Sequence, residues 1–230
     1  MVIPPLLNGL IASKLKKRVR VNGMFNIISH PGKPLVEHLW GVTNIALADM
    51  PLTCKHLTDV VATATKLHDI GKANAFFQRY IKETNASARK SMHNDKHTHH
   101  AKVSAVIALY SWLDRHPQSY REAVILYMAI EKHHGNLKKP RFDITKEDVD
   151  IMKRQLASIN PEDLRLIGEH IGIRLDHSEI TTFIDKLLRL TAKIRTMLPT
   201  LTDDDIELYM DINYVFSVLI NADKLDAGIG

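Results

Sequence analysis

The chain has little of what would let it form disulfides, cross a membrane or bind ATP. Cys54 is its single cysteine, so the 230 residues can form no internal disulfide and no thiolate-rich zinc site. No run of about 18 apolar residues occurs, which argues against a transmembrane helix. The phosphate-binding pattern G-x-x-x-x-G-K-[ST] is also absent. In residues 1–20 the apolar part precedes the basic part, the reverse of a secretory signal. We therefore expect a protein of the reducing cytoplasm.

Signals for β-structure are equally scarce. Asn22-Gly23, flanked by Arg18–Val21 and Met24–Ile27, is the one clear hairpin signal. Elsewhere apolar residues recur at helical spacing, and the last helical stretch is apolar on several sides, so we expect it at the centre of the fold. We predict a mobile polar loop over 84–97, a capping box at Ser119–Glu122, and helices over about 34–49, 55–70, 73–82, 98–114, 120–134, 145–158, 161–171, 178–197 and 205–224.

These patterns predict one mostly α-helical domain over residues 1–230, because no linker long enough to divide domains occurs. The chain has 31 lysines and arginines against 26 aspartates and glutamates, which gives a formal net charge of +5. This positive charge mildly favours anionic partners. A basic stretch at 14–20 is a solvated face or a phosphate-binding patch.

Histidine is abundant, with 13 residues, and it is the commonest metal ligand in proteins. His68 and Asp69 are adjacent in Lys66-Leu67-His68-Asp69-Ile70-Gly71-Lys72, at the expected end of a helix. An imidazole nitrogen beside a carboxylate suits divalent metals of intermediate hardness, and the two carboxylate oxygens can bridge two ions. We expect Gly71 to turn the backbone sharply after this pair. An isolated His-Asp pair usually marks nothing more than the end of a helix. Its interpretation as part of a metal site therefore depends on further ligands.

Five further residues are candidates to join His68 and Asp69. Two neighbouring helical side chains point about 100° apart, so His133 and His134 can reach one site only near a helix end, which Gly135 marks. A buried aspartate near the end of the last helix needs a partner, and a cation is a natural one. The candidate set is His38, His68, Asp69, His100, His133, His134 and Asp223, with His99 competing for the position of His100 and with His93 and His97 as weaker candidates in the polar loop.

The order His, His-Asp, His, His-His, Asp resembles the HD superfamily of metal-dependent phosphohydrolases, an all-α fold. His68-Asp69-Ile70-Gly71-Lys72, then His100 with Ser104-Ala105, then His133-His134-Gly135, is similar to the HD nuclease domain of the CRISPR type I helicase–nuclease. The resemblance covers about residues 30–226, and its H-x-x-x-Ser-Ala spacing favours His100 over His99.

The resemblance implies a metal-dependent nuclease that cleaves single-stranded DNA, with RNA as an open alternative. It assigns one metal to His38, His68, Asp69 and Asp223 and a second to Asp69, His100, His133 and His134. It implies one or two Mn²⁺, Ni²⁺, Co²⁺ or Fe²⁺ ions per chain, with Mg²⁺ as an alternative, and it places Lys72 beside the scissile phosphate. A separate CRISPR helicase subunit and an RNA-guided surveillance complex are the implied partners.

Basic residues near the site are candidates for binding flanking phosphates: Lys72, Lys132, Lys138, Lys139 and Arg141. Phe76, Phe77 and Tyr80 either stack on bases or belong to the core. Two other functions stay open at this stage. One is a nucleotide phosphohydrolase or cyclic-nucleotide phosphodiesterase of the same superfamily. The other is a non-catalytic interaction module, which has no chemical reason to keep seven candidate ligands.

Overall fold

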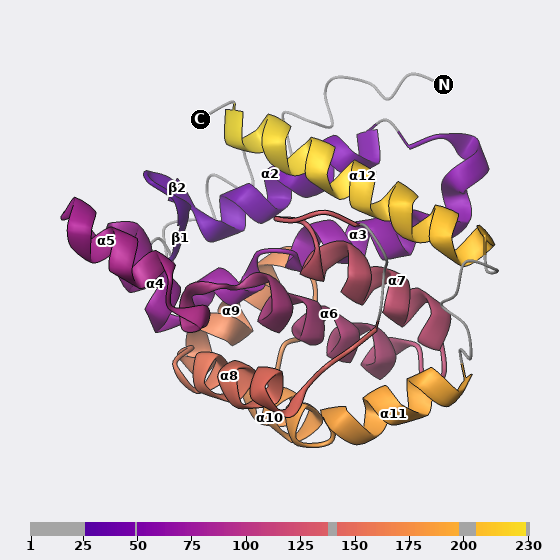
Figure 1. Ribbon diagram of the computed structural model, residues 1–230. Coiled ribbons are helices and arrows are strands. Elements are labelled where there is room, and N and C mark those ends of the chain that lie inside the picture. Colours follow the sequence, from indigo (N-terminus) through magenta and orange to yellow (C-terminus); the bar gives the residue numbers. More distant parts are fainter. Residues whose placement is uncertain (1–25, 49, 138–141, 198–205, 229–230) are drawn as a thin grey trace.

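A computed structural model describes residues 26–48, 50–137, 142–197 and 206–228 (Figure 1). Within these ranges the chain is almost entirely helical, which confirms the all-α prediction. None of the helices in these ranges has the length and apolar character that a membrane crossing needs. The elements are β1 (Ile28–His30), β2 (Lys33–Pro34), α2 (Leu35–Ala48), η2 (Leu52–Leu57), α3 (Thr58–Leu67), η3 (Ile70–Ala73), α4 (Ala75–Lys82), α5 (Ala86–His93), η4 (Lys96–Thr98), α6 (Ala101–Arg115), α7 (Tyr120–Glu131), α8 (Lys146–Ala157), α9 (Pro161–Ile171), α10 (His177–Asp185), α11 (Leu187–Met197) and α12 (Ile206–Gly228).

The small hairpin turns at Pro31-Gly32, where Gly32 takes a positive φ of 79° that glycine adopts without strain. β1 and β2 pair antiparallel, with Ile28 opposite Pro34 and His30 opposite Lys33. A small hairpin near the N-terminal end agrees with the predicted fold class, but no signal for a turn at Pro31-Gly32 was identified in the sequence. The turn predicted at Asn22-Gly23 lies outside the described residues.

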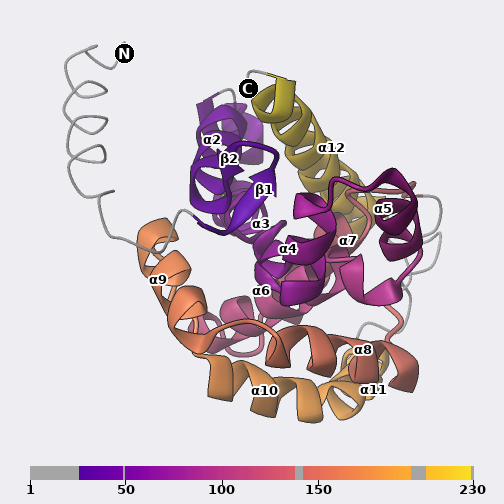
Figure 2. The ribbon, with the colours of Figure 1, turned by 90° about the vertical axis from the view of Figure 1, so that its left-hand side faces the viewer.

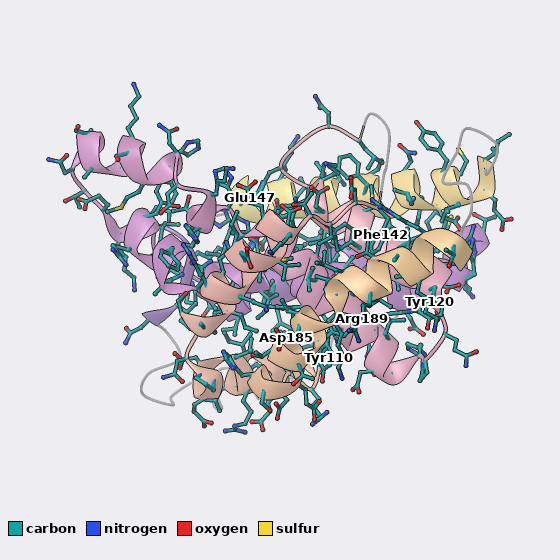
Figure 3. The ribbon with its side chains drawn as sticks, turned by 60° about the horizontal axis from the view of Figure 1, so that its bottom comes forward. Tyr110, Tyr120, Phe142, Glu147, Asp185 and Arg189 are labelled. Carbon is teal, nitrogen blue, oxygen red and sulfur yellow. The ribbon has the colours of Figure 1, made fainter. Side chains whose placement is uncertain are left out.

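The helical hairpin of α6 and α7 forms the centre of the molecule. Every residue of α6 from Val103 to Trp112 is buried, and so is every residue of α7 from Ala123 to Ile130. α3 packs on both helices, α2 and α12 complete that side, and α8 and α10 pack on α6 from the other (Figures 1 and 2). Figure 3 shows the α10–α11 side, with Asp185 and Arg189 labelled. The central hairpin is therefore covered by helices on both sides.

The last helix does not lie at the centre, and that prediction was wrong. α12 packs against α2 and α7 through one face, which includes Leu208, Ile212 and Leu219. Its opposite face leaves Ile206 and Met210 exposed, at 71% and 60%. The apolar residues of α12 exceed what one contact face needs, so hydrophobicity alone overestimated its burial.

Three local predictions also need correction. The helix predicted over 178–197 is broken at Lys186, whose N–H bonds to the carbonyl of Phe183 before α11 starts afresh. The Ser119–Glu122 capping box does not form, because the Ser119 hydroxyl donates to Glu122 and accepts from the indole of Trp112. The stretch 84–97 is not a loop, since it contains α5 and the first two residues of η4.

α5 forms although none of its residues is buried. The side chain of Asn85 accepts from the N–H of Ala88 and caps its N-terminus at 3.0 Å. Asp95 caps η4 in the same way through His97. These caps stabilise the two short helices in place of an apolar stripe. The sequence of this segment has no such stripe, so its polar composition suggested a loop.

Gly71 is required by a close approach, not by an unusual turn. It is not among the positive-φ residues of the described chain, so the change of direction after α3 does not depend on a backbone conformation that favours glycine. η3 lies so near the start of α6 that a Cβ on Gly71 would lie 2.6 Å from the carbonyl oxygen of His100 and 2.8 Å from the hydroxyl of Ser104. The N–H of Gly71 also donates to that hydroxyl at 2.9 Å. This contact fixes η3 against α6.

We predict that Gly71→Ala lowers the free energy of unfolding by about 1–3 kcal/mol, because backbone atoms of α6 cannot move aside for a methyl group. Urea unfolding followed by circular dichroism measures this change. Gly135→Ala is the control, since the nearest atom to its Cβ lies 3.7 Å away. Equal stability of the two variants would contradict the close-packing argument.

Candidate metal centre

His68 and Asp69 lie where one helix stops and another begins. α3 ends at Leu67, His68 follows as its C-cap, and Asp69 precedes η3 with φ −112° and ψ 6°. This break lets two adjacent side chains reach one place, and both are buried. The sequence motif thus lies at a change of backbone direction in the protein interior.

Two groups of side chains meet at Asp69. In the first group, the His38 Nε2 atom lies 3.1 Å from Asp69 Oδ2 and 3.2 Å from Asp223 Oδ1, and His68 Nε2 lies 3.6 Å from the same Asp223 atom. One ligand atom from each of these four residues lies within 4.8 Å of every other. Elements far apart in the sequence, α2, the α3–η3 junction and α12, supply them.

The second group shares Asp69 through its other oxygen. His100 Nε2 lies 2.9 Å from Asp69 Oδ1, His133 Nε2 lies 3.3 Å from it, and His134 Nε2 lies 2.9 Å from His100 Nε2. His100 comes from the start of α6, and His133 and His134 from the turn after α7. Of this group only His134 is exposed, so the second group opens to solvent on its side. The structure therefore brings all seven candidate residues together.

Hydrogen bonds at Nδ1 orient three of the imidazoles. The carbonyl oxygens of Thr65 and Ile130 can only accept, so His68 and His133 donate from Nδ1 at 2.8 and 2.6 Å. The Nε2 atoms of these two rings lie 3.5 Å from Asp69 Oδ2 for His68 and 3.3 Å from Asp69 Oδ1 for His133. Buried partners of this kind orient metal-binding histidines in proteins.

The third imidazole has a carboxylate partner that the sequence analysis missed. His38 Nδ1 lies 2.6 Å from Asp226 Oδ2, and Lys33 Nζ lies 2.7 Å from the same oxygen. A Cβ on Gly41 would lie 1.9 Å from Asp226 Oδ1, so any other residue there would have to displace this carboxylate. The only signal in the sequence is that Asp226 follows Asp223 by three residues, which puts both on one face of a helix.

The donor set fits divalent metal ions. Three buried atoms of the cluster, Asp69 Oδ1, His133 Nε2 and Asp223 Oδ1, make no hydrogen bond within the described residues. They lie close to other ligand atoms without donor–acceptor geometry, as lone pairs that converge on a cation do. Nitrogen and carboxylate ligands without thiolates suit Mn²⁺, Fe²⁺, Co²⁺ or Ni²⁺.

Lys72 lies within the cluster and not on the surface. Its Nζ is 2.6 Å from Asp69 Oδ2 and 5.5 Å from the centre of the Phe77 ring. Burial alone would raise the pKa of Asp69, but His68, Lys72 and His100 hold it well below its usual range. Asp69 is therefore ionised in the protein interior.

The other predicted residues are not among the ligand groups of the described chain. Lys132 pairs with Glu131 at 2.9 Å, and Lys138, Lys139 and Arg141 lie outside the described residues. His97 bonds to Asp95 at 2.7 Å, and neither it nor the exposed His93 and His99 belongs to a ligand group. Phe77 is buried and Phe76 is half-buried.

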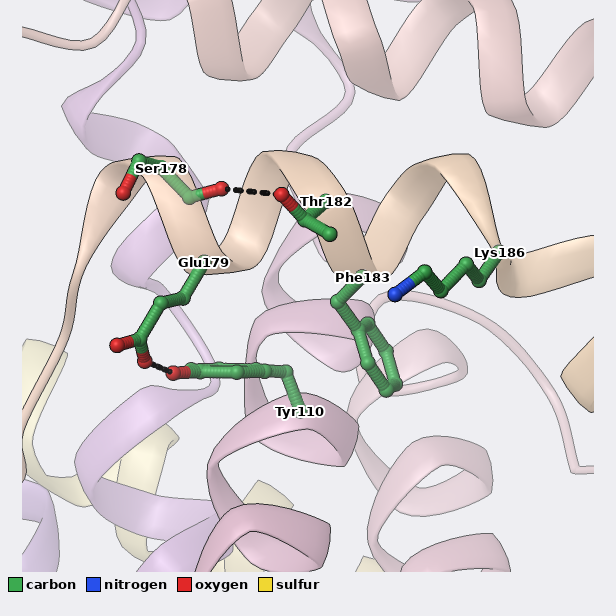
Figure 4. A pocket seen from close by; sticks show the side chains of 6 residues that line it. All are labelled: Tyr110, Ser178, Glu179, Thr182, Phe183 and Lys186. Atoms are coloured by element: carbon green, nitrogen blue, oxygen red, sulfur yellow. Dashed lines mark hydrogen bonds between the residues drawn. The ribbon is translucent and has the colours of Figure 1, made fainter.

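A separate pocket lies between α6 and α10 (Figure 4). Tyr110 donates to Glu179, which also pairs with Arg174. The remaining lining residues are Ser178, Thr182, Phe183 and Lys186. None of the candidate ligands lines it, so the chemistry of the cluster is not in this pocket.

We predict that His100→Ala removes one metal-binding event while His99→Ala keeps both. His100 is buried beside Asp69, whereas His99 is exposed and its Nε2 lies 3.2 Å from the carbonyl of His93. Isothermal titration of both variants with Mn²⁺ measures the difference. Loss of a binding event in His99→Ala, with both events kept in His100→Ala, would shift the ligand register by one residue.

We also predict that metal binding at the first group depends on pH more steeply than at the second. Burial alone would lower the pKa of His38, but Asp223, Asp69 and Asp226 raise it to about 9, so His38 is protonated at neutral pH. Burial instead lowers the pKa of His100 to about 3, so this ring is already neutral. A metal at the first group must displace a proton, and its affinity should rise about tenfold per pH unit up to about pH 9.

Mn²⁺ titrations in several buffers between about pH 6.5 and 8.5 measure this proton release. Asp69 and Asp223 stay ionised throughout that window, because the pKa of each lies well below its usual range. Identical pH dependence of the two binding events would refute the expected difference.

Comparison with known proteins gives one match. The family model described as Cas3, HD domain, matches residues 33–201, which is most of the chain. No curated protein and no solved structure matches. The matched range contains six of the seven candidate ligands and ends before Asp223.

Proposed function

The chain belongs to the family of Cas3 HD domains, and from this premise we propose that it cleaves single-stranded DNA in CRISPR interference. Membership supports an HD-type, metal-dependent nuclease of a CRISPR system. Our proposal includes three further points: the substrate is single-stranded DNA, a helicase is the partner, and an RNA-guided surveillance complex is the source of the substrate.

The observation that carries the proposal is the grouping of six ligand side chains around the seventh, the buried carboxylate of Asp69. We assign His38, His68, Asp69 and Asp223 to one metal and Asp69, His100, His133 and His134 to the other. Bound divalent ions supply Lewis acidity and a water of lowered pKa, which is the chemistry that phosphodiester hydrolysis requires. The imidazoles are held by carbonyl and carboxylate partners, so little reorganisation is needed on binding.

Lys72 is the proposed cation for the nonbridging phosphate oxygens. Its Nζ lies within the cluster, and an ammonium group in a partly desolvated site offsets developing negative charge strongly. Lys132, Lys138, Lys139 and Arg141 stay predicted contacts for flanking phosphates.

Access favours a single strand over a duplex. Asp69 is 1% exposed, and only His134 and Asp223 of the seven ligands are not buried. A duplex must be bent or opened before its backbone can reach so deep a group, at a cost of order 1–6 kcal/mol, whereas a single strand is flexible. A helicase that delivers single strands would remove this cost.

We expect the Mn²⁺-loaded protein to cleave a single-stranded oligonucleotide at least about tenfold faster than the matched blunt duplex, which corresponds to about 1.4 kcal/mol. Asp69→Ala is the negative control, because it removes the ligand common to both groups, and it should lose nearly all activity with every metal. Deoxynucleoside triphosphates and cyclic nucleotides are assayed alongside.

Two outcomes would contradict the proposal. Equal cleavage of the blunt duplex would show that the backbone of a duplex reaches the site without deformation. Hydrolysis of the cyclic nucleotide with no cleavage of oligonucleotides would assign the chain to the phosphodiesterase branch of the superfamily.

A further inference from the structure

A segment beside the cluster is unusually basic and contributes little to the core. We call residues 75–99, which comprise α4, α5 and η4, the basic arm. Phe77 is the only buried residue of α4, and α5 has none. In Figure 1 the two helices project from one edge of the molecule. The need for a stable core does not account for this segment.

The charge of the basic arm exceeds that of the rest of the chain. Its acidic residues are Glu83 and Asp95 alone, and its basic residues are Arg79, Lys82, Arg89, Lys90 and Lys96. More than half of the formal net charge of +5 therefore lies in this short segment. A local excess of this size attracts polyanions.

Most of these cations are not neutralised by the protein. Lys96 pairs with Glu147 of α8. Among the described residues no carboxylate pairs with Arg79, Lys82, Arg89 or Lys90, although Lys82 donates to the backbone carbonyl of Asn26. All four side chains are exposed. They are available to phosphate groups without breaking an existing ion pair.

Aromatic rings connect the basic arm with the cluster. The ring of Phe77 lies 5.0 Å from His100 and 5.9 Å from Tyr80. Beyond it, Tyr80 lies 6.0 Å from His93, and the guanidinium of Arg89 lies over the Tyr80 ring at 5.4 Å. Flat rings and a guanidinium thus continue outward from a candidate metal ligand to an exposed surface.

We propose that the basic arm binds the single-stranded nucleic acid that extends from the candidate metal site. Tyr80 and Arg89 form a surface on which a base stacks, and Arg79, Lys82, Arg89 and Lys90 bind the phosphates beside it. A combination of exposed cations and π-faces is what single-strand binding uses, whereas a protein partner of this surface would have to be acidic. The inference rests on the proposed function and identifies where its substrate is held.

Two variants test the two kinds of contact. Arg89→Gln with Lys90→Gln removes two phosphate-binding charges from α5. The matched control, Lys186→Gln with Arg189→Gln, removes two exposed charges at the junction of α10 and α11, away from α5 (Figures 1 and 3). Tyr80→Leu removes the stacking ring while keeping an apolar side chain, and Tyr80→Phe restores the ring.

Binding of a fluorescent oligothymidylate is measured by anisotropy in EDTA, so that no cleavage occurs. We expect the slope of log Kd against log salt to fall in magnitude by about 1.4 in the Arg89–Lys90 variant, from about 0.7 for each lost phosphate contact. Tyr80→Leu should weaken binding about fivefold or more and Tyr80→Phe should restore it. The Lys186–Arg189 control should bind as the wild type does.

Cleavage of the oligonucleotide is compared with hydrolysis of bis(p-nitrophenyl) phosphate, a diester that has no flanking nucleotides to bind the basic arm. The proposal expects a larger loss on the oligonucleotide than on the small diester. If the wild type cleaves the oligonucleotide and the variants of the basic arm bind and cleave it equally well, the inference is wrong and the surface serves another partner. If the wild type cleaves no oligonucleotide, the proposed function itself fails.

Discussion

The ionised carboxylate of Asp69 in the protein interior is the constraint on which the site depends. A buried charge is costly unless cations or hydrogen-bond donors surround it. Lys72 at 2.6 Å and the protonated His38 at 3.1 Å supply this compensation at Oδ2, and His100 lies 2.9 Å from Oδ1. Since these residues come from η3, α6 and α2, the positions of three elements are tied to the two oxygens of one side chain.

The central helices separate apolar packing from polar chemistry along their length. α6 and α7 are buried over long continuous runs, and their ligands lie only at the start of α6 and just after the end of α7. The short connection makes the two helices neighbours, so His100 meets His133 and His134 across the hairpin. The polar ligands thus meet at one end of the α6–α7 hairpin, and the apolar core along the rest of the two helices is not interrupted.

Much of the fold could be predicted from periodicity, and the failures have physical causes. Helices with a clear apolar stripe, such as α8 and α9, lie close to their predicted bounds, and in the structure Thr145 and Asn160 cap them. α5 was missed because local caps hold it without burial. α12 was placed too deep because apolar composition does not say how many faces a helix covers.

The sequence by itself determined the seven candidate ligands, because imidazole and carboxylate groups at helix ends are chemically distinctive wherever they stand in a chain. Tertiary structure alone decided that Asp226 holds His38 and that Gly71 leaves room for α6. Each of these depends on a contact between elements distant in the chain. Periodicity describes the faces of a single helix, and it carries no information about which atom of another helix lies opposite.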